Sequence, residues 1–227
     1  MFFKPRIKSL LEGFTDHHSH ILPGVDDGVK KMEVSLQVLE QYEQFGISEL
    51  WCTPHIMEDI PNTTAGLKAR FAELCEAYQG SIILHLAAEY MMDGLFEERL
   101  EQGDILTLGM DGNQILVETS YFTPPMDMDN ILSRIKRKGF FPVLAHPERY
   151  VYMDNKRYKE LKEKDIRFQL NLSSLAGAYG PEAKAKARWL LKKKFYNLAG
   201  SDLHSIRNME FWNARVPRAL RDVLQPS

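Results

Sequence analysis

Residues 128–149 read MDNILSRIKRKGFFPVLAHPER, and this stretch holds the pattern that decides the fold. Its first part, Met128–Lys138, has helical spacing of apolar residues, and Gly139 follows where left-handed helix caps are common. Phe141–Ala145 is then a short apolar run typical of a buried strand, and the polar residues His146 and Arg149 come directly after it. Helix, glycine, short apolar run and polar loop form the repeating unit of a parallel α/β sheet.

The same unit recurs along the chain and predicts an α/β fold, either an α/β barrel or a doubly wound sheet. Strands are expected at Gly13–Asp16, Glu49–Thr53, Ser81–Ala88, Gln114–Val117, Phe141–Ala145, Arg167–Asn171 and Asn197–Gly200. Helices are expected at Lys31–Phe45, Thr64–Gln79, Asp93–Glu101, Met128–Lys138, Asn155–Glu163, Pro181–Lys194 and Asn208–Leu224. No repeat or Pro/Ser-rich linker divides the chain, so we expect one domain over residues 14–227, preceded by a separate helical arm at residues 1–13.

Composition limits the classes of function. The chain has 29 basic and 31 acidic residues, so it has no large positive net charge whose electrostatic field would attract nucleic acid or an anionic membrane. Met1–Arg6 lacks the apolar core of a signal peptide, and no stretch approaches the ~20 apolar residues that span a bilayer. We therefore expect a cytoplasmic protein without direct membrane insertion. Cys52 and Cys75 are expected to be reduced, and neither begins the Cys-x5-Arg motif of a thiol phosphatase.

Metal-binding residue types follow almost every predicted strand. The carboxyl ends of parallel strands converge on one rim, where active sites are built. In chain order, the residues after these strands are His18, His20, His55, Glu89, Glu118, His146, Asp202 and His204. The strand Arg167–Asn171 is the exception, since Asn171, Ser173 and Ser174 stand there instead. This placement predicts a shared metal site.

Each residue alone has a plainer interpretation. His18-Ser19-His20 places both imidazoles on one side of an extended chain, as a metal site needs, but solvated histidines would show the same pattern. Asp27 belongs to an Asp-Gly turn dipeptide and needs no metal to explain it. Glu89 and Glu118 each end an apolar run, where a carboxylate is costly to desolvate unless a metal or an arginine pairs with it.

Two further histidines are not expected to bind metal, and two arginines are candidates for binding phosphate. His17 should point away from its neighbour, and His85 lies below the rim, so packing or hydrogen bonding is expected for both. Arg149 follows a predicted strand closely and offers a planar cation for two phosphate oxygens, although a surface ion pair explains it equally well. Arg207 is a weaker second candidate for binding phosphate.

The motifs together resemble a known family. They are the runs at 15–28 (TDHHSHILPGVDDG), 53–55 (TPH), 88–90 (AEY), 116–118 (LVE), 145–150 (AHPERY) and 200–204 (GSDLH). In this order they resemble the polymerase and histidinol phosphatase (PHP) superfamily, and more narrowly its CpsB/CapC branch. That branch contains manganese-dependent tyrosine phosphatases of bacterial capsule and exopolysaccharide synthesis. The resemblance implies a distorted (β/α)7-type barrel with its metal cluster at the carboxyl ends of the strands.

The resemblance also implies which residues hold up to three divalent ions. The sets are His18, His20, Glu89 and Asp202 for one ion, Glu89, Glu118 and His146 for a second, and Asp27, His55 and His204 for a third. Glu118, where some other PHP proteins have histidine or cysteine, favours the phosphatase branch. Ligands of nitrogen and oxygen without thiolate suit Mn²⁺, which we expect, and also iron or zinc.

The function implied is hydrolysis of phosphotyrosine by direct attack of a metal-bound hydroxide. Arg149, with Arg207, would bind the phosphate, and Asp202 or His204 would assist as catalytic groups. The expected partner is the phosphotyrosine tail of a bacterial tyrosine kinase that regulates polysaccharide synthesis, and a homo-oligomer remains open.

The alternatives to this function are a small-molecule phosphatase, a nuclease and a binding module. A small-molecule phosphatase acting on a substrate like histidinol phosphate would need the same metals. A PHP-type nuclease would show a basic path laced with aromatic residues, whereas Lys192-Lys193-Lys194 is the one dense basic cluster in the sequence. A binding module with structural metals is disfavoured because every ligand position of the family is filled.

Overall fold

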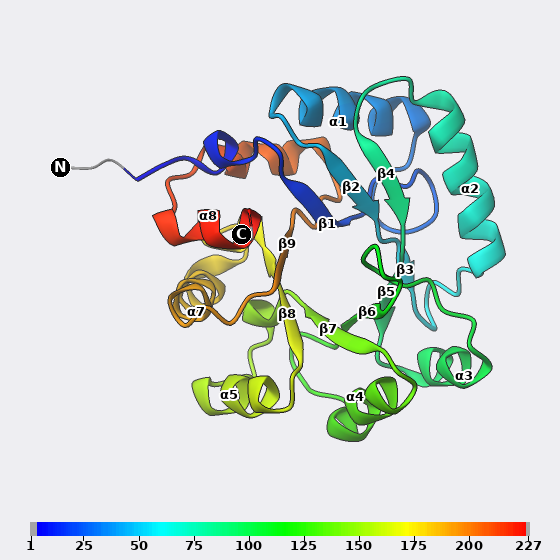
Figure 1. Cartoon of the computed structure of the whole chain (residues 1–227), viewed down its shortest axis with the longest axis vertical. Coiled ribbons are helices and arrows are strands. Elements are labelled where there is room, and N and C mark those ends of the chain that lie inside the picture. The colour runs from blue at the N-terminus through cyan, green and yellow to red at the C-terminus, as the bar shows by residue number, and fades with distance from the viewer. Residues whose placement is uncertain (1–3, 226–227) are drawn as a thin grey trace.

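The computed structural model describes residues 4–225, and its paired strands all run parallel within two sheets (Figure 1). The first sheet has the order β1 (Thr15–Ser19), β2 (Glu49–Cys52) and β4 (Ile83–Leu86). The second has the order β3 (His55–Ile56), β5 (Glu89–Met91), β6 (Gln114–Glu118), β7 (Phe141–Ala145), β8 (Arg167–Asn171) and β9 (Leu198–Gly200). The α/β class with a parallel sheet is therefore confirmed.

The helices lie outside the strands, as Figure 1 shows. They are α1 (Met32–Gln44), α2 (Thr64–Ala77), α3 (Gly94–Gln102), α4 (Met128–Arg137), α5 (Asn155–Glu163), α6 (Leu172–Ala176), α7 (Gly180–Lys192) and α8 (Arg221–Leu224). Short 3-10 helices occur at η1 (Ile7–Leu10), η2 (Pro147–Arg149), η3 (Ile206–Asn213) and η4 (Arg218–Leu220). The predicted helices before Pro181 agree with α1 to α5 within two residues at each end.

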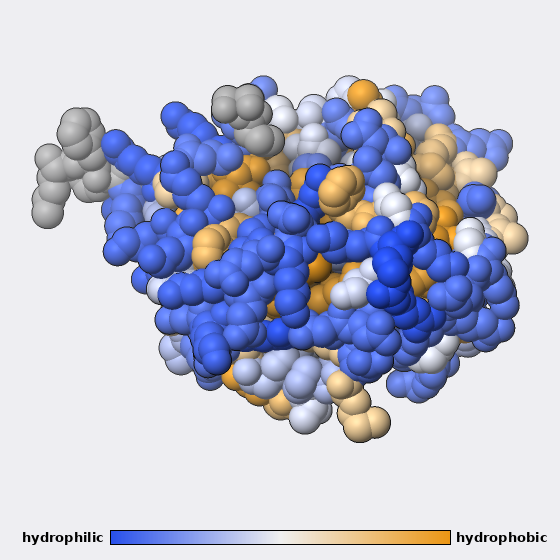
Figure 2. All heavy atoms as spheres, turned by 60° about the horizontal axis from the view of Figure 1, so that its bottom comes forward, coloured by the Kyte–Doolittle hydropathy of each residue, from blue (hydrophilic) through white to orange (hydrophobic). Residues whose placement is uncertain are grey.

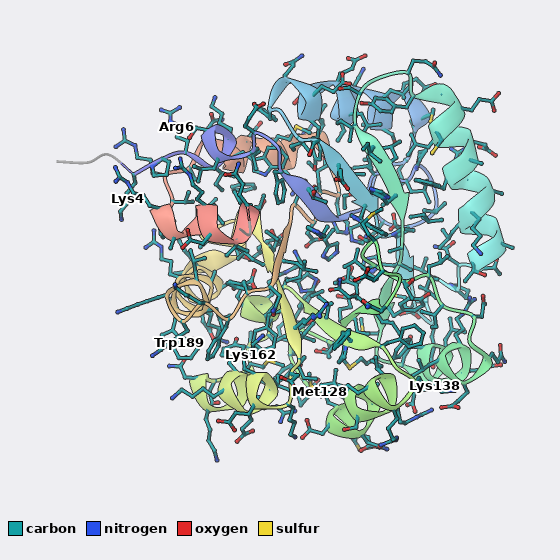
Figure 3. The ribbon with its side chains drawn as sticks, in the orientation of Figure 1. Lys4, Arg6, Met128, Lys138, Lys162 and Trp189 are labelled. Atoms are coloured by element: carbon teal, nitrogen blue, oxygen red, sulfur yellow. The ribbon has the colours of Figure 1, made fainter. Side chains whose placement is uncertain are left out.

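Backbone hydrogen bonds join the two sheets into one curled surface. At one edge only two residues separate β2 from β3 and β4 from β5, and the N–H of Glu89 donates to the carbonyl of Pro54 at 3.1 Å across this junction. At the other edge, the N–H of Asp202 donates to the carbonyl of His18 at 2.8 Å, so the segment after β9 lies along the end of β1. The strands therefore surround a common centre, which side chains fill, whereas Lys4, Arg6 and Lys138 lie at the periphery (Figure 3).

Several strands differ from those predicted. The apolar run Ser81–Ala88 is not one strand, because β4 covers only its middle and β5 begins at Glu89. The short strand β3 was not predicted, and it pairs with β5 through His55 and Glu89. Strand β1 continues to Ser19, so His18 lies within the strand rather than after it, beside a register shift against β2. Such a bulge re-aims side chains at the end of a strand.

The predicted helix Asn208–Leu224 is wrong. The chain forms η3, an extended stretch from Ala214 to Pro217, and then η4 and α8. Pro217 lacks an N–H and disfavours helical backbone in the residue before it, so a continuous helix cannot pass this point. The N–H of Val216 donates instead to the carbonyl of Pro5 at 3.0 Å.

The N-terminal arm was predicted at residues 1–13, of which residues 1–3 lie outside the described part. Ile7, Leu10 and Leu11 are buried in the same hydrophobic cluster as Trp212 and Val216. The N–H of Ile7 also donates to the carbonyl of Ala214 at 3.2 Å. The described part of the arm thus packs against the segment after β9, as the blue and red elements show in Figure 1.

Apolar side chains from β2, β3, β5 to β9 and most helices form one large buried cluster. The face shown in Figure 2 is accordingly mostly hydrophilic, with apolar atoms visible only in limited areas. Ionisable side chains are nevertheless buried at the carboxyl ends of the strands, and these include His18, His20, Glu89, Glu118, His146 and Asp202. Burying a charge costs free energy unless the charge is paired or binds metal. This cluster therefore marks a candidate metal site. Within residues 4–225, no helix has the length and apolar character needed to cross a membrane.

Candidate metal centre

The predicted metal ligands converge at the carboxyl ends of the strands. Within each of three groups, the ligand-type atoms lie within 4.8 Å of one another: His18, His20, Glu89 and Asp202; His55, Glu89 and Glu118; and His20, Asp27, His55 and His204. The first group is the set implied for one ion. The second differs from the implied set by having His55 where His146 was expected, and the third adds His20.

Two hydrogen bonds determine which nitrogens of the central histidines are free to bind metal. His18 Nδ1 lies 2.9 Å from Oε1 of Gln169, and His20 Nδ1 lies 2.8 Å from Oδ2 of Asp26. Both partner oxygens can only accept, so each Nδ1 carries a proton and donates it. In the neutral imidazoles, Nε2 of His18 and Nε2 of His20 therefore each carry a free lone pair. These two nitrogens lie 3.0 Å apart.

Carboxylate oxygens face the same point. Oε2 of Glu89 lies 3.1 Å from Nε2 of His18 and 3.2 Å from Nε2 of His20. Oδ1 of Asp202 lies 3.5 Å and 3.4 Å from the same two nitrogens. Neither oxygen has a partner in hydrogen-bond geometry among the described residues, despite these short distances. Four lone-pair atoms directed at one point, with no donor between them, fit a divalent cation.

The electrostatics of the site agree with this fit. Burial alone would lower the pKa of His18, but the carboxylates of Glu89 and Asp202 raise it to about 9. Burial likewise opposes protonation of His20, yet Asp26 brings its pKa well above the usual value. Burial would raise the pKa of Glu89, and the neighbouring His18 instead holds it well below the usual range. Without a cation, protons on the histidines must therefore balance the buried carboxylates.

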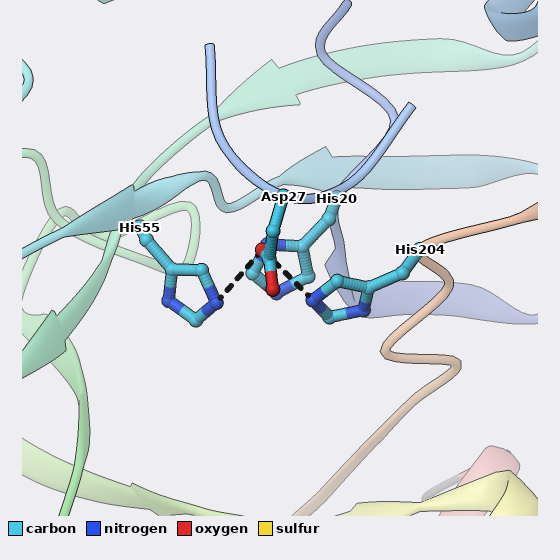
Figure 4. A group of neighbouring side chains, drawn as sticks. All are labelled: His20, Asp27, His55 and His204. Atoms are coloured by element: carbon cyan, nitrogen blue, oxygen red, sulfur yellow. Dashed lines mark ion pairs between the residues drawn. The ribbon is translucent and has the colours of Figure 1, made fainter. Parts of the chain in front are cut away.

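The third group, drawn in Figure 4, includes the exposed carboxylate of Asp27. Oδ1 of Asp27 is 3.5 Å from Nε2 of His55 and 3.4 Å from Nε2 of His204. The Asp27 side chain is 64% exposed, whereas His55 is buried. The hydrogen bond with His204 holds the pKa of Asp27 below its usual range. A cation bound here would remain open to substrate and water.

Glu89 connects the remaining ligands. Nδ1 of His55 lies 3.3 Å from Oε2 of Glu89 and 3.2 Å from Oε1 of Glu118. Nε2 of His146 lies 3.0 Å from Oε1 of Glu89 and 3.7 Å from Oε2 of Glu118. Both oxygens of Glu89 thus face histidine nitrogens on different strands, which is the geometry that a bridging carboxylate requires.

The backbone is constrained where these ligands are held. His146 has φ 32° and Asp202 has φ 50°, both in the left-handed region that side-chain-bearing residues rarely adopt. Such backbone persists where the surrounding structure fixes it, typically at functional sites. Gly200 leaves space for β1, because a Cβ there would lie 2.4 Å from Cβ of His18. At Gly28, a Cβ would lie 2.1 Å from the carbonyl oxygen of His20.

Sequence reasoning missed two supporting residues, Gln169 and Asp26. Oε1 of Gln169 accepts from Nδ1 of His18 and also from the backbone N–H of His146, at 3.1 Å. Asp26 accepts from Nδ1 of His20 and from the backbone N–H of His55, at 3.1 Å. A polar residue inside an apolar strand was the available signal for Gln169. For Asp26 the signal was its place beside Asp27 in the same turn.

A pocket of about 640 Å³ opens above the predicted ligands. Its lining residues are Asp27, His55, Met57, Glu89, Met91, Glu118, Thr119, Ser120, Tyr121, Phe122, His146, Arg149, Tyr179, Asp202, His204 and Asn208. Arg149 stacks between two of them, with its Cζ 4.3 Å from the ring centroid of Tyr121 and 4.0 Å from that of Tyr179. It also donates to Oδ2 of Asp202 at 2.8 Å. Arg207 is exposed and is not part of this lining.

The residues expected to have structural roles lie outside the ligand groups. Nδ1 of His17 faces the carbonyl of Ala199 at 3.3 Å. Nε2 of His85 faces Oε2 of Glu49 at 3.0 Å, and its ring stacks on Trp51. Both histidines thus have hydrogen-bonding or packing partners, as predicted.

The chain is similar in sequence and in structure to known proteins. "Tyrosine-protein phosphatase YwqE" of Bacillus subtilis is 28% identical over 207 residues, covering 86% of this chain and 79% of that protein. "Tyrosine-protein phosphatase CpsB" of Streptococcus pneumoniae is 30% identical over 204 residues, covering 84% and 83%. A crystal structure from work on YwqE and CpsB, described as metal-dependent tyrosine phosphatases, superposes with a TM-score of 0.78 at 26% identity, covering 86% of this chain and 81% of the other.

A family model described as "Capsular polysaccharide synthesis, CpsB/CapC" matches residues 14–218. That range contains every predicted metal ligand and Arg149. The resemblance inferred from the motifs is therefore confirmed, and the chain belongs to the CpsB/CapC family.

Proposed function

We propose that this chain hydrolyses phosphotyrosine monoesters with the help of bound divalent metal ions. The observation that carries the proposal is one pocket that combines unpaired nitrogen and oxygen ligand atoms at its floor with the cation of Arg149 in its wall. Metal ions and arginine are groups that proteins commonly use to bind and neutralise a phosphoryl group. The similar proteins named above are tyrosine phosphatases, which supports the same substrate class.

The proposed cofactor is Mn²⁺, with iron or zinc as alternatives, at up to three positions. The ligands would be His18, His20, Asp27, His55, Glu89, Glu118, His146, Asp202 and His204. Histidine and carboxylate ligands without thiolate suit these metals. When bound, such ions would lower the pKa of water and neutralise negative charge on the phosphate.

The other residues of the pocket bind and orient the substrate. Arg149 is held flat between Tyr121 and Tyr179, so it can offer parallel N–H groups to two phosphate oxygens. Asp202 fixes that guanidinium through Oδ2, and His204 is a candidate for proton transfer at the pocket surface. Arg207 is a second phosphate-binding candidate outside the pocket lining.

The reaction would be direct hydrolysis, in which water attacks phosphorus in line with the leaving phenol. Cys52 is buried, and burial raises the pKa of its thiol. Cys75 is exposed on α2, and neither cysteine lines the pocket. A phosphocysteine intermediate would need a thiolate in that pocket. A phenol leaving group, with a pKa of about 10, needs less protonation than an alkoxide.

The wider assignment belongs to the same proposal. The strand order and the hydrogen bonds between the edges support a distorted (β/α)7-type barrel. Membership of a capsular polysaccharide synthesis family supports the phosphotyrosine tail of a bacterial tyrosine kinase as the substrate. Two unpaired cysteines agree with a reducing, cytoplasmic location.

A panel of phosphoesters tests this function. Initial rates would be measured on a phosphotyrosine peptide, a phosphoserine peptide, histidinol phosphate and single-stranded DNA. Each would be assayed after chelation and after reconstitution with manganese, iron or zinc. We expect metal-dependent turnover with preference for phosphotyrosine and highest activity with manganese. Absence of metal-dependent turnover on every ester would contradict the enzyme assignment, and preference for histidinol phosphate or DNA would contradict the substrate.

A further inference from the structure

One side chain at the mouth of the pocket is unusual for its environment. The large apolar residues that are exposed in residues 4–225 are Ile83, Met110, Phe122, Met126, Phe141, Val151 and Phe211. Phe122 is 74% exposed, and of these residues it alone lines the pocket above the ligand groups. An exposed phenyl ring in a pocket is available to contact a bound molecule.

Hydrogen bonds anchor the backbone that leads into Phe122. The N–H of Thr119 donates to the hydroxyl oxygen of Tyr150 at 3.3 Å, and the carbonyl of Tyr121 accepts from the N–H of Val151 at 2.9 Å. The N–H of Phe122 itself donates to Oγ of Ser120 at 3.3 Å. These bonds tie the segment to the same stretch of chain that carries Arg149. Phe122 and Arg149 thus lie on segments that are hydrogen-bonded to each other, and both line the pocket.

Two methionines complete an apolar collar, defined here as Met57, Met91 and Phe122. Met57 follows β3 and Met91 lies in β5, and both are partly buried and line the same pocket. Methionine is flexible and polarizable, and its sulfur makes favourable contacts with aromatic rings. None of the three side chains bears charge, unlike the floor of the pocket.

The collar and the floor together match an aryl phosphate. In such an ester the ring is attached directly to the ester oxygen, so a phosphate at the floor places the ring at the mouth. The phosphoserine ester has only a methylene group at the corresponding place. Resting on the proposed phosphatase function, we infer that Phe122, with Met57 and Met91, binds the phenyl ring and sets the preference for aryl over alkyl phosphates.

The test compares matched esters in matched variants. Phe122→Ala should lower kcat/KM for a phosphotyrosine peptide roughly tenfold, mainly through KM, because ring stacking contributes about that factor. Turnover of a phosphoserine peptide with the same flanking residues should not change. Phe122→Leu should fall between wild type and Phe122→Ala. Met126→Ala is the control, since Met126 is exposed in the same loop but lies outside this pocket.

A binding measurement separates this inference from the proposed function. Calorimetry on the manganese-loaded protein would give the Kd of phenylphosphonate and of inorganic phosphate. Phe122→Ala should weaken phenylphosphonate roughly tenfold and leave phosphate unchanged. If Phe122→Ala raises the Kd of both ligands equally, or of neither, the proposed role of the collar is wrong. Failure of the wild type to hydrolyse any ester would instead contradict the proposed function, while the ratio of the two Kd values would still test the collar.

Discussion

Gln169 and His18 form a buried hydrogen bond between the two sheets, with Oε1 2.9 Å from Nδ1, although they are 151 positions apart in sequence. The amide oxygen accepts the proton on Nδ1 and so leaves Nε2 of His18 as a lone pair toward Glu89. The same oxygen accepts from the backbone N–H of His146 at 3.1 Å. One side chain of β8 thus orients predicted ligands carried by β1 and by the end of β7.

Gln169→Leu should therefore weaken metal binding. Leucine fills similar volume but offers no acceptor, so the imidazole of His18 can rotate or adopt its other tautomer. Loss of a partner that orients a metal ligand typically costs about 10- to 100-fold in metal affinity. Calorimetric titration of the metal-free variant with manganese would measure the change.

Gln114→Leu is the matched control for this experiment. Gln114 begins β6 and is partly buried, but it bonds to no predicted ligand. We expect its manganese affinity to equal that of the wild type. If Gln169→Leu also binds manganese as tightly as the wild type, the proposed role of the hydrogen bond is wrong.

Arg149→Ala should lower kcat/KM for phosphotyrosine by roughly 100-fold, the usual effect of removing a group that stabilises transition-state charge. Bound metal should remain, because Oδ2 of Asp202 keeps the donor Nδ2 of Asn171 at 2.7 Å. Arg149→Lys should not restore activity, since an ammonium cannot stack flat between Tyr121 and Tyr179 or bind two oxygens in parallel. Steady-state kinetics with elemental analysis of each variant would measure both effects.

The second arginine provides the comparison. Arg207 is exposed outside the pocket lining, so Arg207→Ala should change kcat/KM far less than Arg149→Ala does. Loss of metal from Arg149→Ala would count against a phosphate-binding role for that residue and would place it in the support of the metal centre instead.

Gly200→Ala should destabilise the protein and disturb the metal site together. A Cβ at this position would lie 2.4 Å from Cβ of His18, so β1 and β9 would have to separate. Overpacking of this kind costs about 1–3 kcal/mol in the free energy of unfolding. Urea denaturation would measure that loss, and titration with manganese would measure the accompanying loss of affinity.

Gly139→Ala separates backbone strain from this clash. Gly139 has φ 89°, but nothing lies within 4 Å of a Cβ built there. Left-handed backbone with a side chain costs about 1–2 kcal/mol, so stability should fall in this variant too. Its manganese affinity should not change. If both variants bind manganese normally, close packing behind His18 is not needed to hold the ligand.

Local patterns were sufficient to predict much of the fold. Strand β7 was found at Phe141–Ala145 because its apolar run stands between a helix with a glycine cap and a polar loop. In the segment Asn208–Leu224, Pro217 was a local signal against one continuous helix, but it did not show which structure would form instead. The backbone is extended at Val216 because it pairs with Pro5, and that contact links opposite ends of the sequence. Long-range pairing of this kind cannot be inferred from spacing.

The candidate site was likewise predictable only in part. The metal-binding residues could be recognised because they lie at the ends of predicted strands, and parallel strands bring those ends together. Their grouping depends on rotamers and backbone bends instead. His55 reaches Glu118 through Nδ1 at 3.2 Å, whereas Nε2 of His146 remains 3.7 Å from the same carboxylate. Gln169 was not predicted because an amide is a poor candidate for a metal ligand. Its function is to orient another residue.

The last prediction concerns pH. In the metal-free protein the folded pKa of His18 is about 9, above its usual 6.5. A raised folded pKa contributes stability that is complete below about pH 6.5 and is lost as pH rises through 9. The raised pKa values of His20 and His55 act in the same direction, and the lowered pKa of His17 places its titration below this range. The metal-free protein should lose on the order of 3 kcal/mol between pH 6.5 and pH 9.

Bound manganese should remove this loss, because the cation takes the place of the protons between the carboxylates. Metal binding requires neutral imidazoles, so manganese affinity should rise over the same interval. Urea denaturation at pH 6.5 and pH 9, in chelator and in saturating manganese, would show a stability difference between the two forms that widens with pH. A metal-free protein that is equally stable at both pH values would show that the histidines are not protonated in place of the metal.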